Sequence, residues 1–346
     1  MLLAALLPAP AGAASSAVVL TYHHVAEDTP PSTSVTPETF RRHVDHLADS
    51  GFHVWPLPKL VATLRAGGEV PERTVALTFD DGYRSVYETA FPLLRRRGWP
   101  FTVFVTTEYV DGGDDNFATW DQLREMEAAG ATIANHSVSH PHMIRRRQGE
   151  SESAWRQRMR GEITRAQARL EQEVKDPPLL FAYPFGEFSP AVAAMVTDLG
   201  YVGFGQQSGA FGPGSDFAAL PRFPVATGFA SMETFKLKVR SRPLPVKHTR
   251  PESGVLGPDD ARPTLRIALA AGPYRPDSVR CYLRGESVPL EFEGGDPPVL
   301  KVRPSTPIGA GRTKVNCTAP VQGSDDWFWY SFLWMKPLAD GSWYRE

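Results

Sequence analysis

The sequence lacks the features that mark nucleic-acid-binding, membrane-spanning and cysteine-rich proteins. It has 37 lysine and arginine residues and 39 aspartate and glutamate residues, which gives a formal net charge of −2. There is thus no basic excess of the kind that attracts nucleic acid. No segment approaches the ~20 apolar residues that a membrane helix needs. Cysteine occurs only twice, at Cys281 and Cys317; in an oxidising compartment the two can form a disulfide that stabilises a small domain, and otherwise they are buried free thiols.

The N-terminal residues lack the positive charge with which a signal peptide usually begins, but they have its other features. An apolar run from Met1 to Leu7 is followed by small residues up to Ser16. This is the pattern of a hydrophobic region followed by a cleavage site. We therefore predict a signal peptide over residues 1–16 and an exported protein, periplasmic or in the cell envelope. The alternative is a loosely packed apolar tail.

Internal repeats and low-complexity tracts are also missing, and the remaining chain divides by its periodicity. Residues 17–240 alternate short apolar runs with amphipathic helical patterns, as α/β proteins do. About six such units indicate a barrel-like or a doubly wound parallel sheet, and their number favours a distorted, incomplete (β/α) barrel. Within these residues we predict strands at Thr74–Phe79 and Thr132–Asn135, a helix that begins at Thr36-Pro37 and a helix over Val86–Arg97. Five prolines interrupt residues 241–263, which we predict to be a linker. Residues 264–346 show short strand-like runs between turns and predict an all-β, sandwich-like accessory domain.

Two adjacent carboxylates follow one of the predicted strands, in Thr78-Phe79-Asp80-Asp81-Gly82. In parallel α/β folds, catalytic residues lie where strands enter loops. Neighbours along an extended chain point to opposite sides, so Asp80 and Asp81 would take different roles, one as a metal ligand and the other as a base. The alternative is an Asp-Asp-Gly turn with solvated charges.

Two histidines follow another predicted strand, in Asn135-His136-Ser137-Val138-Ser139-His140. A His-x-x-x-His spacing places both imidazoles on one helical face, which suits a shared cation, although the Glu of a metalloprotease motif is missing. Two histidines and one carboxylate leave a coordination position open, as catalytic metal sites do. Zinc is the first expectation for the single divalent ion, and Co, Ni, Fe or Mn would fit the same ligands. The alternative is a pair of surface histidines.

Two further clusters lie at the ends of predicted strands. In Phe181-Ala182-Tyr183-Pro184-Phe185-Gly186, a strand runs into a Pro/Gly turn, and its aromatic residues either line a sugar-binding groove or pack in the core. In Thr21-Tyr22-His23-His24-Val25, the two histidines point to opposite sides, so at most one of them faces the site.

Together these motifs resemble the polysaccharide deacetylase (NodB homology) family, the fourth carbohydrate esterase family, over Ala17–Val225. The resemblance implies a NodB-type barrel, with Asp80 as the base. It implies Asp81, His136 and His140 as the metal ligands.

The segment Phe181–Gly186 resembles the third motif of the family, which forms one wall of the groove. Tyr183, Pro184 and Phe185 are therefore expected in the substrate site. The arginine that often precedes this motif is absent, since Leu179 and Leu180 stand there. We expect Arg222, in Leu220-Pro221-Arg222-Phe223-Pro224, to belong to the site and to orient the base in its place.

The Leu-x-His motif that supplies the catalytic acid in the family is also missing, and His248 lies in the predicted linker. The chain resembles the branch that includes exported poly-N-acetylglucosamine deacetylases, in which an N-terminal strand ending in Tyr-His supplies the acid. By this resemblance His23 takes the role, and His24 is the weaker choice.

The resemblance implies a metal-dependent hydrolase that removes N-acetyl groups from a polysaccharide containing N-acetylglucosamine. Metal-activated water, the base Asp80 and the acid His23 would carry the reaction. Alternatives are a peptidoglycan or chitin deacetylase, a deacylase of small N-acyl compounds, or a glycan-binding protein without activity. We expect no nucleic-acid partner and no transmembrane segment, and the sequence carries no signature of the number of subunits.

The C-terminal domain contains one densely aromatic run, Trp327-Phe328-Trp329-Tyr330-Ser331-Phe332-Leu333-Trp334. In a sandwich strand alternate residues are buried, which leaves a second set of rings facing outward. We expect core and interdomain packing rather than sugar stacking.

Overall fold

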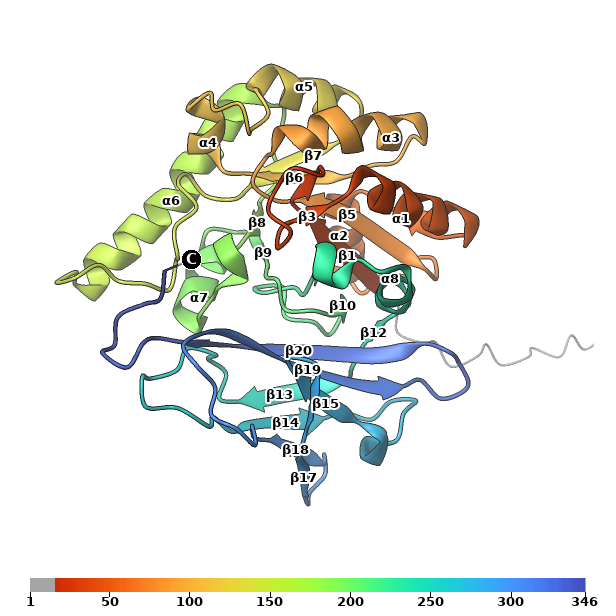
Figure 1. Cartoon of the computed structure of the whole chain (residues 1–346), viewed down its shortest axis with the longest axis vertical. Coiled ribbons are helices and arrows are strands. Elements are labelled where there is room, and N and C mark those ends of the chain that lie inside the picture. The colour runs from red at the N-terminus through yellow and green to blue at the C-terminus, as the bar shows by residue number, and fades with distance from the viewer. Residues whose placement is uncertain (1–15, 346) are drawn as a thin grey trace, which may run out of the picture.

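A computed structural model describes residues 16–345, in which a helix-covered sheet lies against a β-sandwich (Figure 1). We call the helical part up to Ser241 the N-terminal domain and the part from Arg242 onward the C-terminal domain. The signal peptide predicted over residues 1–16 lies outside the described residues except for Ser16.

The N-terminal domain is built on a curled sheet, for which nine strands are found among the described residues. Six of them are parallel neighbours in the order β1 (Ala17–Tyr22), β5 (Thr74–Phe79), β6 (Thr102–Val105), β7 (Thr132–Asn135), β8 (Leu180–Ala182) and β9 (Val202–Phe204). Three short strands complete it: β4 (His53–Val54) pairs with β5, and β10 (Ala210–Phe211) and β11 (Phe223–Pro224) pair with β1. A separate pair, β2 (His24–Val25) and β3 (Ser34–Val35), follows β1.

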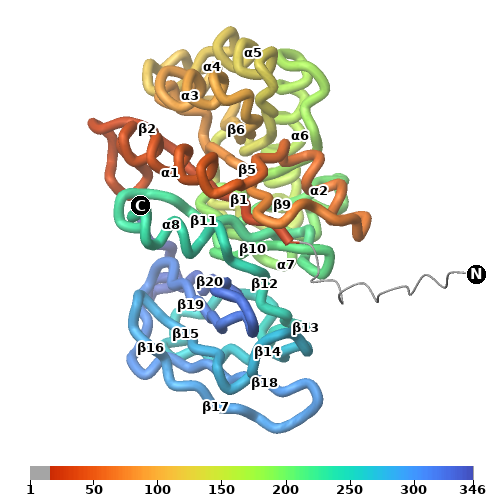
Figure 2. The backbone as a smooth tube through the Cα atoms, turned by 90° about the vertical axis from the view of Figure 1, so that its right-hand side faces the viewer, coloured from red at the N-terminus to blue at the C-terminus, as the bar shows by residue number. Residues whose placement is uncertain are grey.

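Helices cover the outside of this sheet (Figures 1 and 2). They are α1 (Pro37–Asp49), α2 (Leu57–Arg65), α3 (Phe91–Arg96), α4 (Thr107–Asp111), α5 (Trp120–Ala128), α6 (Glu152–Glu173), α7 (Pro190–Asp198) and α8 (Met232–Val239). Single turns of other helix types occur at Val86–Ala90, Pro184–Gly186, Thr227–Phe229 and Pro276–Ser278.

Local sequence signals fix several helix starts as expected. The Thr36 side chain accepts a hydrogen bond from the amide of Thr39, and Pro37 occupies the first turn. At α5, Thr119 and Gln122 form a reciprocal capping box. The helix predicted over Val86–Arg97 begins as one π turn and continues as α3.

The segment from Leu220 to Val225 spans the gap between the two ends of the sheet. On one side, Leu220 exchanges backbone hydrogen bonds with Gly203 and Gly205 beside β9. On the other side, β11 pairs in parallel with β1, and the amide of Val225 donates to the carbonyl of Thr21. Because it lies between both ends, this segment carries Arg222 into the interior of the curled sheet.

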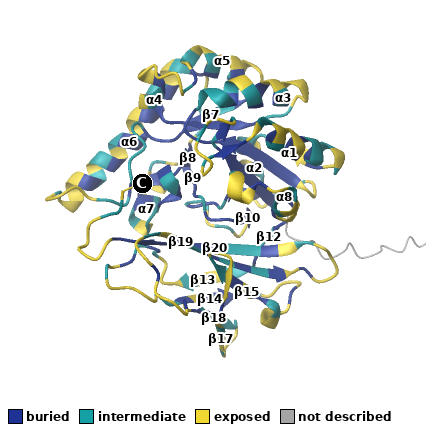
Figure 3. Cartoon of the chain, viewed as in Figure 1, coloured by how far each residue is buried: buried dark blue, intermediate teal, exposed yellow. Residues whose placement is uncertain are grey.

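The parallel strands are buried on both faces, as Figure 3 shows for the central sheet. All six residues of β1 and of β5 are buried, which explains their nearly continuous apolar sequences. One core packs α1, α3 and α5 against one face of the sheet, and a second cluster includes α2 and residues of β8 and β9.

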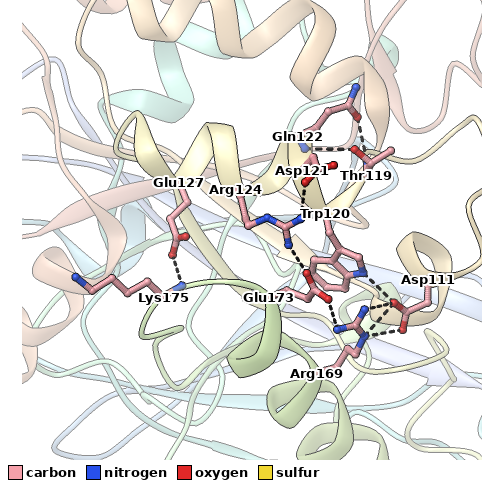
Figure 4. A network of polar contacts seen from close by, with 10 residues as sticks. All are labelled: Asp111, Thr119, Trp120, Asp121, Gln122, Arg124, Glu127, Arg169, Glu173 and Lys175. Carbon is pink, nitrogen blue, oxygen red and sulfur yellow. Dashed lines mark hydrogen bonds and ion pairs between the residues drawn. The ribbon is translucent and has the colours of Figure 1, made fainter.

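A surface network of charged side chains joins α4, α5 and α6 (Figure 4). Asp111 accepts hydrogen bonds from Trp120 and Arg169, and Glu173 accepts from both Arg169 and Arg124. These groups are partly exposed, so solvent screens their charges and each pair stabilises the fold only slightly.

The C-terminal domain is a sandwich of a five-stranded and a four-stranded sheet. The first has the order β12 (Arg242–Pro243), β20 (Trp327–Lys336), β19 (Gly311–Pro320), β15 (Arg280–Leu283) and β16 (Glu286–Val288). The second has the order β13 (Val246–Arg250), β14 (Leu265–Leu269), β18 (Val299–Val302) and β17 (Leu290–Glu293). A separate apolar core lies between the two sheets.

The linker predicted over residues 241–263 is not a simple linker, because β12 and β13 lie within it. Both are edge strands of their sheets. An edge strand tolerates proline, since one side of it has no partner to which an N–H must donate. Pro243 lies in the edge strand β12 and β13 follows it, so the C-terminal domain begins near Arg242 rather than at Thr264.

Cys281 and Cys317 face each other on β15 and β19 and form a disulfide. Most aromatic residues of β20 serve packing, as expected, whereas Trp327 is exposed. Trp334 is fully buried in the sandwich core, whereas Trp329 packs edge-on against Phe223 of the N-terminal domain, with 5.2 Å between ring centroids.

The distorted α/β barrel and the β-rich C-terminal region predicted from the sequence are confirmed. Among residues 16–345, no helix combines the length and the apolar composition needed to cross a membrane.

Candidate metal centre and active site

The four sequence motifs meet because they follow neighbouring parallel strands. The order β1, β5, β6, β7, β8 places the ends of β1, β5, β7 and β8 along one edge of the sheet. The carboxyl ends of parallel strands are where α/β folds build their sites. His23, Asp80, Asp81, His136 and Phe185 all lie on the loops that leave these ends.

Asp81, His136 and His140 form a compact cluster of metal-ligand atoms. Asp81 Oδ1 lies 3.3 Å from His136 Nε2 and 3.4 Å from His140 Nε2. Ligand atoms bound ~2 Å from a tetrahedral ion lie roughly 3.3 Å apart. Asp81 Oδ1 and His136 Nε2 are buried without a hydrogen-bond partner. A cation between these atoms would satisfy both of them, so the residues fit a divalent metal.

The surroundings of His136 and His140 prepare both residues to act as metal ligands. The Nδ1 atom of His136 lies 2.7 Å from the carbonyl oxygen of Ala182, to which it donates, and this directs the Nε2 lone pair toward Asp81. Burial lowers the pKa of His140 to about 4, so the neutral form that binds metals dominates near pH 7. Burial also opposes protonation of His136, but the nearby carboxylates of Asp81 and Asp80 raise its pKa. A cation would take the place of that proton.

The two histidines are not on a helix, which corrects the helical placement predicted from their spacing. Residues 136–142 are a loop in which Ser137 and His140 have positive φ values of 72° and 52°. Such backbone is uncommon for residues other than glycine and is concentrated at functional sites. Side-chain hydrogen bonds hold it: Ser137 Oγ accepts from the amide of His140, and Asn135 Oδ1 accepts from the amide of Ser137.

Asp80 and Arg222 form a fully buried ion pair beside the ligand cluster. Two hydrogen bonds of 2.7 Å join the guanidinium to the two carboxylate oxygens. Arg222 also donates to the carbonyl of Gly205 and to Thr78 Oγ1. Burial opposes ionisation of Asp80, but the charge and hydrogen bonds of Arg222, together with the nearby His136 and His23, lower its pKa. The carboxylate is thus held ionised and in one orientation, and Arg222 contacts Asp80 rather than lining a groove.

His23 and His24 have different surroundings, although both lie near Asp81. His23 is partly exposed, and its charge acts on Asp80, Asp81 and His140, so it lies close to all three. His24 is buried and stacks on Tyr83 with 3.5 Å between ring centroids. Burial and the nearby His23 lower the pKa of His24 to about 4.

Of the three residues expected at the groove wall, two are buried and one is partly exposed. Tyr183 and Pro184 are buried, and the hydroxyl of Tyr183 donates to the carbonyl of Ala218. They are core residues, which corrects their predicted place in the substrate site. Phe185 is partly exposed and packs edge-on against His140, with 4.4 Å between ring centroids. The turn that follows β8 explains the difference, since the positive φ of Phe185 (59°) directs its side chain away from the buried Tyr183 and Pro184.

Four residues near the site had not been singled out from the sequence. Tyr83 and Tyr109 lie close enough to Asp81 for its charge to raise the pKa of each phenol, in addition to the effect of burial. Glu162 on α6 accepts hydrogen bonds from the amide and hydroxyl of Ser139, next to His140. Glu187 is fully buried beside the Phe185 turn. Tyr83 and Glu187 could have been suspected because each directly follows a motif, but Tyr109 and Glu162 carry no such signal.

Comparison with known proteins agrees with this geometry. Residues 67–204 match the family model described as polysaccharide deacetylase. The chain is 25% identical over 244 residues to the poly-beta-1,6-N-acetyl-D-glucosamine N-deacetylase of Escherichia coli K12, covering 60% of this chain and 36% of that relative. It is 25% identical over 166 residues to the enzyme of the same name from Staphylococcus aureus MRSA252, covering 46% of this chain and 57% of that relative. The chain therefore spans only part of the length of these relatives.

Solved structures share the fold of the N-terminal domain. The Streptococcus pyogenes deacetylase PplD, in complex with acetate, superposes with a TM-score of 0.58 at 21% identity, over 65% of this chain and 99% of that chain. IcaB from Ammonifex degensii superposes with a TM-score of 0.56 at 24% identity, over 64% of this chain and 94% of that chain. Both alignments leave about a third of this chain unmatched.

Proposed function

Through residues 67–204 this chain belongs to the polysaccharide deacetylase family, and we propose that it hydrolyses N-acetyl groups on a polysaccharide that contains N-acetylglucosamine. The observation that carries the proposal is the buried cluster of Asp81, His136 and His140, with two unsatisfied ligand atoms, beside the ion pair of Asp80 and Arg222. We propose one divalent ion as the cofactor, with zinc first among the candidates.

The ligand set leaves a coordination position free, as in catalytic sites. A divalent ion held by Asp81, His136 and His140 would supply Lewis-acid activation of water and of the acetyl carbonyl. The residues of the chain itself carry the proton transfers.

Asp80 accepts a proton from the attacking water, acting as the general base. Its carboxylate is kept ionised by Arg222 and cannot rotate away, because both oxygens are bound. His23, beside Asp80 and Asp81, donates a proton to the departing amine, which is a usual task for histidine near neutral pH. The ring of Phe185 forms an apolar wall next to His140, against which the acetyl group or sugar can lie.

We also propose that the protein is exported. The apolar N-terminal run predicts a signal peptide, and a disulfide between Cys281 and Cys317 is typical of oxidising compartments.

The test is acetate release from a panel of substrates, with and without a chelator, together with metal analysis of the purified protein. The panel contains poly-N-acetylglucosamine, chitin and peptidoglycan fragments, and a small N-acetylated compound. Acetate release that the chelator abolishes supports the proposal, and the best substrate in the panel distinguishes the polysaccharide from its alternatives. Glycan binding without acetate release from any of them would instead indicate a binding protein.

Two variants separate the roles of the residues. Asp80→Asn should keep the metal and lose turnover, because the amide cannot accept the proton, whereas His136→Ala should lose both. Metal content and acetate release are measured on each variant. If Asp80→Asn retained most of the activity, Asp80 would not be the base.

A further inference from the structure

The C-terminal domain reaches the wall of the candidate active site. We call residues Pro184–Gly186 the Phe185 turn. Arg312 binds Phe185 itself, Lys314 binds Gln206, which is packed against the turn, and Tyr344 binds Glu187, which follows it. Figure 1 shows the C-terminal segment leaving the sandwich and running toward α7, which follows this turn. These contacts come from β19 and from the chain terminus, so two separate parts of the domain converge on one point.

The Phe185 turn is strained and packs directly against His140 of the candidate ligand cluster. Phe185 has φ 59° and ψ 4°, a left-handed conformation that a bulky residue adopts only when its surroundings impose it. Its ring packs edge-on against His140 and stacks flat on His142, with 3.8 Å between the centroids of the second pair. A shift of this turn would therefore move the wall of the site and a neighbour of a metal ligand.

Strand β19 holds the turn from one side. Arg312 Nη1 donates to the carbonyl of Phe185 at 3.0 Å, and its guanidinium lies 5.5 Å from the centre of the Phe185 ring. Lys314 Nζ donates to the carbonyl of Gln206 at 2.7 Å. Gln206 is packed so closely on Gly186 that a Cβ there would lie 2.6 Å from the Cβ of Gln206. Holding Gln206 thus also fixes the position of the turn.

The C-terminal segment holds the turn from the other side, through a buried carboxylate. The hydroxyl of Tyr344 donates to Glu187 at 2.8 Å, and His142 Nδ1 lies 2.9 Å from the other carboxylate oxygen. Arg145 binds the carbonyl of Tyr344 at 2.9 Å and lies 3.6 Å from Glu187. Since Glu187 is fully buried, the loss of any of these partners would leave the negative charge of its carboxylate poorly compensated.

We propose that the C-terminal domain is a positioning element of the active site, in which Arg312, Lys314 and Tyr344 hold the Phe185 turn against His140. The proposal rests on the proposed deacetylase function for its kinetic consequence. It differs from the usual expectation for an accessory β domain, which is to bind polymer away from the reaction centre. Arg312, Lys314 and Tyr344 act through other residues and need not touch the substrate.

The test is the double variant Arg312→Ala/Tyr344→Phe, compared with the matched control Arg275→Ala/Tyr274→Phe. The control removes the same groups from the same domain, but its contacts, to Asp277 and Ala270, stay within the sandwich. Both proteins are assayed on the polysaccharide and on a short N-acetylglucosamine oligomer. Amide hydrogen exchange is followed over residues 183–188, where the amides of Gly186 and Glu187 are hydrogen-bonded within the turn.

We expect faster exchange in this turn and about a 10-fold lower kcat/KM on both substrates, because a small misplacement of the wall lowers the rate even for a short substrate. Metal content, thermal midpoint and exchange in the β-sandwich should match those of the control. Unchanged exchange in the turn would overturn the proposal, as would unchanged kinetics. A loss confined to the polymer would also overturn it and would indicate a glycan-binding domain. If the unaltered protein released no acetate from any substrate, the deacetylase proposal would fail, whereas the exchange comparison would still decide whether the turn is held in this way.

Discussion

The buried pair of Asp80 and Arg222 gives the sharpest quantitative prediction. Both side chains are fully buried, and Arg222 makes hydrogen bonds to both oxygens of Asp80, to Gly205 and to Thr78. Arg222→Met removes the guanidinium but keeps an unbranched chain in its place. The Asp80 carboxylate then remains buried without its counter-ion.

Breaking such a pair by removing one partner typically costs about 3–5 kcal/mol, mostly because the remaining charge is uncompensated. We therefore expect Arg222→Met to lower the free energy of unfolding by about 3–5 kcal/mol at pH 7. Asp80→Asn should also destabilise the protein, because Arg222 then lacks its anion. In the double variant neither charge remains, so its loss should be smaller than the sum of the two single losses by about 2–3 kcal/mol.

The assay is urea unfolding of the four proteins followed by tryptophan fluorescence, with a chelator present so that metal binding does not contribute. Arg275→Met is the matched control, since Arg275 pairs with Asp277 in a two-pronged contact that is exposed to solvent. It should leave the stability unchanged. Strictly additive losses at Asp80 and Arg222 would refute the reasoning, because they would mean that the pair is not coupled.

Two further predictions concern stability. Cys281→Ala/Cys317→Ala should destabilise the C-terminal domain by about 3–4 kcal/mol, because the bridge closes a loop over a sequence separation of 36 residues; urea unfolding of oxidised, reduced and variant protein measures this, and equal stability of all three would contradict it. Burial, together with the charge of Lys314, lowers the pKa of Lys238 to about 7, and burial with the charge of Arg312 lowers that of Lys314 to about 8. The unfolded chain, in which lysine keeps its usual pKa near 10.4, then binds more protons above pH 7, so the free energy of unfolding should rise by about 1 kcal/mol or more from pH 7 to 9. Lys238→Met should reduce that rise, and an unchanged pH dependence in the variant would contradict this account.

The fold was largely readable because its signals are local. Strands such as Thr74–Phe79 and Thr132–Asn135 and the start of α1 were predicted with the bounds that the structure shows. A continuous apolar run, an N-cap and a following glycine act within a few residues, so they need no knowledge of the rest of the chain. The prediction of a linker over residues 241–263 was wrong for the opposite reason. Proline at a sheet edge and proline in a linker look alike until the partner strand is known.

In the candidate site, too, the local signals could be read from the sequence and the long-range contacts could not. The motifs at Asp80, Asp81, His136 and His140 could be picked out because each follows a strand end, and parallel pairing brings such ends together. Their division into ligands and base came from the family resemblance and stays a proposal. The sequence could not tell Phe185 from the buried Tyr183, since the direction of a side chain after a turn depends on backbone angles that only the packed structure fixes.

By itself, the sequence determined that this chain is an α/β domain followed by a β domain, and which motifs carry its chemistry. Only the tertiary structure decided that Arg222 enters the barrel to bind Asp80, and that Arg312 and Tyr344 reach the Phe185 turn. These contacts join residues more than a hundred positions apart. Local propensities act over a few residues and cannot specify such pairs, whereas the closure of the sheet and the docking of the two domains can.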